Sequence, residues 1–160
     1  MDFEERLQKA IARGEKTREA QEREAAGRAM TEEEFRRLHS SIRLELADHI
    51  EKCLLKLPDH FPGFRWESIV GDRGWGGACF RDDVAFGEGS RRANYSRLEI
   101  TVRPYSAAHV VEVTAKGTIR NKEVFSRAQY QKLAEADAQP LRDAVDLWVL
   151  EYAEKYSAAK

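Results

Sequence analysis

The chain has 160 residues, enough for one domain with an appendage, and its 42% hydrophobic residues can supply one core. Its 27 basic and 28 acidic residues leave a formal net charge of -1, which argues against a protein that binds nucleic acid through overall charge. No apolar segment approaches the roughly 20 residues that cross a bilayer, the N-terminus lacks signal-peptide character, and two dispersed cysteines predict reduced thiols. We therefore expect a cytoplasmic protein without membrane contact.

Residues 1–27 predict a charged helical or partly disordered extension. Glu, Arg, Lys, Gln and Ala dominate this segment and favour a helix. Its apolar positions end after the first turns and are Phe3, Leu7, Ala10 and Ile11. A helix with so little to bury is solvated, frayed or ordered by a partner. A single α+β domain is expected over residues 28–160.

A long helix is predicted over residues 31–57, because Thr31 followed by Glu34 has the pattern of a capping box. The helix is expected to end at Pro58. Its apolar residues recur every three or four positions and are Phe35, Leu38, Ile42, Leu46, Ile50, Cys53 and Leu57. One face of this helix therefore belongs to the core.

Alternating apolar and polar residues then predict four to five strands. A turn at 71–74 separates the first two, and a polar loop is expected at 87–94. The strands themselves are expected at 64–70, 75–86, 97–103 and 110–120, with a short one around Val124 and Phe125. Connections this short favour antiparallel neighbours, so the expected topology is a meander.

The C-terminal part predicts more helix. Ser126 and Gln129 repeat the capping pattern and indicate a short helix that contains Tyr130 and Leu133. A longer helix is expected over about 137–157, with one face that carries Leu141, Val145, Trp148, Tyr152 and Tyr156. The fold class is therefore α+β, with a four- to five-stranded antiparallel meander packed against the helices at 31–57 and 137–157.

The segment 73–80 partly resembles the strand with which RNA-recognition modules stack bases. The three aromatic positions of that strand are occupied by Trp75, Gly77 and Phe80, so one stacking position has no ring. Trp75 and Phe80 also differ in parity, so they are expected on opposite sides of the sheet. The resemblance covers eight residues, and a hairpin turn built of small residues is the alternative interpretation.

A binding surface on the outer face of the sheet is a second hypothesis. Its candidate binding residues are Trp75, Tyr95, Arg97, Arg103 and Lys116. Glu99 and Glu112 are expected on the same face, and mixed charge of this kind is typical of an ordinary solvated sheet.

The sequence does not predict a metal site, a cofactor or a catalytic centre. Glu45, His49 and Cys53 follow one another by one helical turn, but zinc would need a further ligand. The candidates for that ligand, none at a characteristic spacing, are His39, His60, Cys79 and Asp83. Adjacent Asp82 and Asp83 point to opposite faces of a strand, and nothing local marks Cys79 as an activated nucleophile.

The resulting hypothesis is a protein-interaction or adaptor domain without catalytic activity. It would associate with a protein partner or with itself through the charged N-terminal helix, the sheet face, or both. One alternative is a single-stranded RNA-binding module on the sheet face. Another is a small-molecule or enzymatic pocket between the sheet and the C-terminal helix, lined by Trp66, Trp148 and Tyr152.

Overall fold

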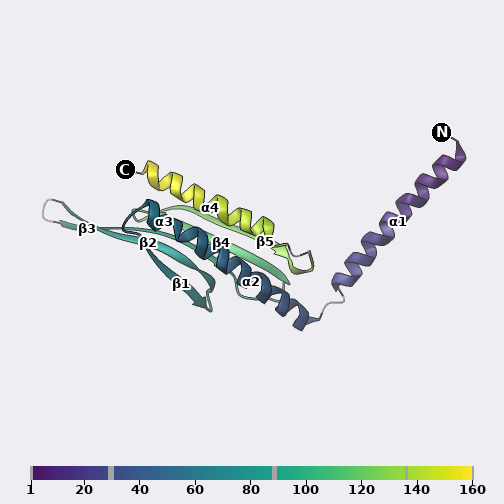
Figure 1. The fold of residues 1–160 in the computed structure, drawn as a ribbon, viewed down its shortest axis with the longest axis horizontal. Coiled ribbons are helices and arrows are strands. Elements are labelled where there is room, and N and C mark those ends of the chain that lie inside the picture. The colour runs from purple at the N-terminus through teal and green to yellow at the C-terminus, as the bar shows by residue number, and fades with distance from the viewer. Residues whose placement is uncertain (1, 29–30, 88–89, 136, 160) are drawn as a thin grey trace.

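The computed structural model describes residues 2–28, 31–87, 90–135 and 137–159 and confirms the α+β class (Figure 1). The elements follow in the order α1 (Phe3–Arg28), α2 (Glu32–Leu54), α3 (Lys56–His60), β1 (Arg65–Gly71), β2 (Gly74–Gly87), β3 (Ser90–Val102), β4 (Val110–Ile119), β5 (Lys122–Lys132), the 3-10 turn η1 (Leu133–Glu135) and α4 (Gln139–Ala158). The five strands form one antiparallel sheet in the order β1-β2-β3-β4-β5, which is the expected meander.

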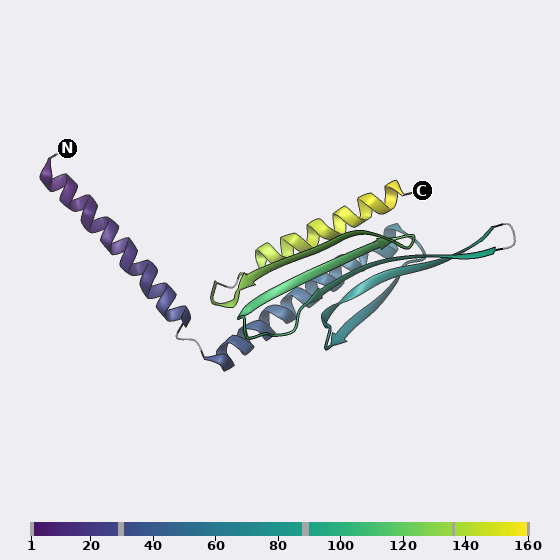
Figure 2. The same cartoon turned by 180° about the vertical axis from the view of Figure 1, so that it is seen from behind.

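Helices α2 and α4 cover one face of the sheet, and the opposite face is open (Figures 1 and 2). Alternation along β3 and β4 places every second side chain beneath the helices. These inward-facing residues are fully or almost fully buried and include Leu98, Ile100, Val102, Val111, Val113 and Ala115. The outward-facing residues between them are mostly polar, so the core lies between the sheet and its two helices.

Helix α2 begins where the sequence predicts it, after an N-cap at Thr31. The backbone N–H of Glu34 donates to Oγ1 of Thr31 at 3.2 Å, which confirms Thr31 as the N-cap. The buried face of α2 carries Phe35, His39, Ile42, Leu46, Ile50 and Leu54. The helix ends at Leu54, slightly before the expected boundary, and the short α3 contains Pro58.

The β1–β2 hairpin turns as expected at 71–74. Gly71 and Gly74 have φ angles of 136° and 122°, which favour glycine. Further along β2, the ring of Trp66 lies so close to Gly77 that a Cβ there would come within 2.0 Å of Trp66 Cη2. A small residue is therefore required under this indole, as the hairpin interpretation of the glycine-rich segment expects.

The loop expected at 87–94 is almost absent. Strand β2 continues to Gly87 and β3 begins at Ser90, and residues 88 and 89 lie outside the described residues. The two strands pair in register from Trp75 opposite Val102 to Gly87 opposite Ser90. Their far end extends beyond the neighbouring strands as a two-stranded ribbon (Figure 2). Backbone pairing thus continues through residues whose polar character indicated a loop.

The prediction of a short helix after Ser126 is wrong. Strand β5 pairs with β4 from Lys122 to Lys132, with one bulge at Val124, and only η1 is helical there. The strand buries Phe125 opposite Gly117, while Arg127 reaches Glu151 of α4 at 2.7 Å. Pairing with β4 satisfies the backbone groups of the strand, which outweighs the local capping pattern.

Helix α1 points away from the sheet and its covering helices (Figure 1). It runs to Arg28, one residue beyond the expected end of the extension at residue 27. Within the described ranges, no helix has both the length and the apolar composition required to span a membrane.

Candidate functional site

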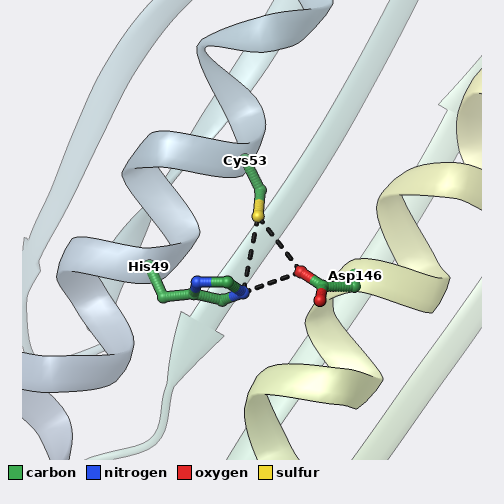
Figure 3. A group of neighbouring side chains, drawn as sticks. All are labelled: His49, Cys53 and Asp146. Atoms are coloured by element: carbon green, nitrogen blue, oxygen red, sulfur yellow. Dashed lines mark hydrogen bonds and ion pairs between the residues drawn. The ribbon is translucent and has the colours of Figure 1, made fainter.

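The structure brings His49, Cys53 and Asp146 together where α2 meets α4 (Figure 3). His49 and Cys53 project from successive turns of α2, and Asp146 faces them from α4. His49 Nε2 lies 2.7 Å from Asp146 Oδ1, and the Cys53 thiol donates to the same oxygen at 3.3 Å. Cys53 Sγ lies 3.5 Å from His49 Nε2, which closes the triangle.

This triangle does not have the arrangement of a nucleophilic triad. In a triad, the nucleophile and the carboxylate contact different nitrogens of the histidine ring, whereas Cys53 and Asp146 both approach Nε2 of His49. Burial, followed by the hydrogen bond to Asp146 and the negative charge of Asp146, raises the pKa of the Cys53 thiol to about 11. The thiol therefore stays protonated at neutral pH, where an effective nucleophile would be a thiolate.

Sequence reasoning found two members of the triangle and missed the third. His49 and Cys53 were visible at i and i+4, but Asp146 lies 93 residues beyond Cys53 and joins only because α4 packs beside α2. The remaining residue of the expected set, Glu45, is instead held by Arg142 at 3.0 Å. In the sequence, Asp146 is visible only as an acidic residue beside the apolar face of α4, and this position alone does not indicate a site.

None of the four further ligands that the sequence suggested takes part in the triangle. His39 is buried against the carbonyl of Arg103 at 3.2 Å, and burial lowers its pKa. Cys79 is buried in the core, where desolvation raises its pKa to about 12, and its thiol donates to the carbonyl of Leu54 at 3.0 Å. His60 is exposed in α3, and Asp83 accepts from Arg81 at 2.8 Å.

The open face of the sheet contains four of the five candidate binding residues: Tyr95, Arg97, Arg103 and Lys116. Arg97 is the most constrained of them. Its guanidinium binds Glu99 at 2.9 Å and also contacts Glu67. Burial alone would lower the pKa of Arg97, but the hydrogen bonds to Glu99 and Glu67 raise it above its ordinary value. The charge of Arg97 is thus already compensated by carboxylates.

The other two candidate cations of this face, Arg103 and Lys116, also lie near acidic residues. Arg103 is 3.9 Å from Glu112, and Lys116 is paired in register with Glu99. A phosphate backbone would have to compete with these carboxylates for the same cations.

Trp75, the fifth candidate, lies on the helix-covered face. It pairs in register with the fully buried Val102, and the guanidinium of Arg43 stacks on its ring at 4.2 Å from the centroid. Phe80 pairs with Arg97 and therefore faces the open side. The expected split between the two rings is confirmed, and they do not form one stacking surface.

The three rings named for the alternative pocket, Trp66, Trp148 and Tyr152, belong to the core and its edge. Tyr152 is fully buried, and Trp148 is 8% exposed. The Tyr152 hydroxyl donates to the carbonyl of Thr118 at 2.8 Å, while Trp66 packs against the core beside Gly77.

Helix α1 presents apolar side chains to solvent. Phe3, Leu7 and Ile11 are 75%, 41% and 53% exposed and follow one another every four residues. Side chains spaced in this way form a stripe along one side of a helix. We call these three residues the α1 stripe.

Comparison with models of protein families, with curated proteins and with solved structures finds no match to this chain.

Proposed function

We propose that this protein is an association domain that pairs with a second copy of itself through the α1 stripe. The observation that carries the proposal is the exposure of Phe3, Leu7 and Ile11 on a helix that projects from the domain (Figure 1). Large apolar side chains gain about 1.5–3 kcal/mol each when they leave water completely. The helix therefore gains stability from a partner that covers this stripe.

A second copy fits the stripe for two reasons. Under two-fold symmetry the same surface meets itself, and an apolar stripe is complementary to an apolar stripe. The chain also has a formal net charge of only -1, so two copies approach each other with little net repulsion. Acidic and basic side chains are intermingled over the rest of α1 and keep the unpaired helix in solution.

The test is sedimentation equilibrium of the full chain from about 1 µM to 1 mM, a range that covers weak to moderate affinities. We expect a concentration-dependent dimer. Leu7→Glu should weaken it by about 100-fold or more, because two-fold pairing removes two leucines and brings two carboxylates together. Leucine and glutamate have similar helix propensities, so α1 should remain helical in this variant.

Leu147→Glu is the matched control, because Leu147 is a leucine of α4 that is 65% exposed and lies outside the α1 stripe. The dimer should persist in this variant. A wild-type chain that stays monomeric over the whole range would overturn the proposal. A dimer that survives Leu7→Glu but dissociates with Leu147→Glu would place the interface on the helical layer and would overturn it as well.

A further inference from the structure

The triangle of His49, Cys53 and Asp146 combines three kinds of metal-binding atom at one point. Their ligand atoms, a sulfur, an imidazole nitrogen and a carboxylate oxygen, all lie within 4.8 Å of one another (Figure 3). Two of the side chains come from one rigid helix and the third from its neighbour. Such a group needs no rearrangement of the backbone to converge on an ion.

Zinc suits this donor set. A thiolate and an imidazole favour Zn²⁺ over Mg²⁺ or Ca²⁺, which prefer oxygen ligands throughout. Tetrahedral zinc with bonds of about 2.0–2.3 Å holds its ligand atoms roughly 3.4–3.6 Å apart. The Sγ–Nε2 and Sγ–Oδ1 distances of 3.5 and 3.3 Å are already close to these values.

Only one distance has to change. His49 Nε2 and Asp146 Oδ1 are 2.7 Å apart, a hydrogen-bond distance, and must separate by roughly 0.7 Å around zinc. The Asp146 side chain is 48% exposed and can rotate to allow this, whereas the His49 side chain is 18% exposed and more strongly held. The exposure of Asp146 also lets an ion reach the triangle from solvent.

We propose that His49, Cys53 and Asp146 form a three-ligand Zn²⁺ site that fastens α2 to α4 and leaves the fourth position to water or to a small exogenous ligand. A bound zinc ion takes the place of the thiol proton, which is released to the solvent. Because the ligands come from two helices, the ion joins the two elements that cover the sheet. This inference does not depend on the pairing of α1.

The test is a Co²⁺ titration of the reduced full chain, followed by displacement with Zn²⁺. Tetrahedral cobalt bound to a thiolate shows intense near-ultraviolet charge transfer and visible ligand-field bands, and both should disappear as Zn²⁺ displaces it. Saturation with Zn²⁺ at about 100 times its dissociation constant should raise the Tm by about 5–10 °C.

Three variants should each remove part of the signal. Cys53→Ser should abolish the charge-transfer band, and His49→Gln and Asp146→Asn should each weaken cobalt binding by about tenfold or more. Far-ultraviolet circular dichroism without metal verifies that each variant is folded. His60→Gln and Asp143→Asn are matched controls, because both residues are exposed and lie outside the triangle, and their affinity should equal that of the wild type.

Three results would overturn the site. One is a wild-type chain without a thiolate–cobalt band. Another is a band that persists in Cys53→Ser, which would assign binding to Cys79. The third is an Asp146→Asn variant with unchanged affinity, which would show that α4 supplies no ligand and that the ion does not join the helices.

Discussion

Substitution of Gly77 by alanine tests how β1 packs against β2. An ideal Cβ at Gly77 would lie 2.0 Å from Cη2 and 2.3 Å from Cζ3 of Trp66. Carbon atoms in contact need about 3.5 Å, so the indole must move by about 1.5 Å. The clash involves ring carbons that pack against the core, and the ring has no flexible end that could turn aside.

The expected destabilisation follows from two opposing effects. Overpacking a core costs about 1–3 kcal/mol, whereas removing glycine from a strand recovers about 0.5–1 kcal/mol of backbone entropy. Gly77→Ala should therefore lower the free energy of unfolding by about 1–2 kcal/mol. For a protein of this size, the Tm should fall by roughly 2–8 °C.

The assay is urea and thermal denaturation of a double-mutant cycle with Trp66→Ala. Without the indole, the three atoms nearest to the added methyl group are absent, so Gly77→Ala should be neutral or stabilising in that background. Gly14→Ala is the control, since no atom lies within 4 Å of a Cβ at this exposed position of α1, and it should not lower the Tm. An equal loss of stability with and without Trp66 would refute the steric explanation.

Two other expectations concern single groups. The Cys79 thiol has its pKa raised by burial from 9.0 to about 12, so its contribution to stability is complete below pH 9 and is lost as the pH rises towards 12. Between pH 9 and 10 the wild type should lose about 1 kcal/mol more than Cys79→Ala in the free energy of unfolding, and parallel pH profiles in urea denaturation would contradict this. Thr31→Ala removes the hydroxyl that accepts from the Glu34 N–H and should cost about 1 kcal/mol, whereas Thr31→Ser should retain most of the stability in the same measurement.

Local patterns were reliable where neighbouring residues settle the structure. Thr31 marks the start of α2 because its side chain accepts a hydrogen bond from Glu34, only three residues away. Alternation along β3 and β4 predicted which side chains are buried, because successive side chains of a strand point to opposite faces. The same count of parity predicts that Trp75 and Phe80 lie on opposite faces of the sheet, and the strand register confirms it.

Local patterns failed where a distant segment supplies the stabilising contact. Ser126 and Gln129 have the spacing of a capping box, which predicts the start of a helix. Residues 126–132 instead pair with β4 at every position, and Phe125 packs on Gly117. The hairpin of β2 and β3 likewise continues through the polar residues that indicated a loop. In both places strand pairing decides the conformation, and single-sequence patterns do not contain the partner strand.

The candidate site likewise has one part that the sequence predicts and one part that only the packing of the helices provides. The spacing of His49 and Cys53 on one helix is a property of the sequence, because residues four apart lie on one side of a helix. Asp146 completes the triangle only because α4 packs beside α2. Glu45, the third residue expected on α2, instead forms an ion pair with Arg142. No spacing rule could have chosen Asp146 among the acidic residues of α4.

The sequence by itself determined the α+β class, the antiparallel order of the strands, and the buried faces of the helix at 31–57 and of the central strands. These properties depend on residues a few positions apart, whose relative directions follow from helix and strand geometry. Only the tertiary structure decided that 126–132 is strand, that carboxylates compensate Arg97, and that Asp146 meets His49 and Cys53. Each of these depends on contacts between segments far apart in the chain, which form only when the helices pack on the sheet.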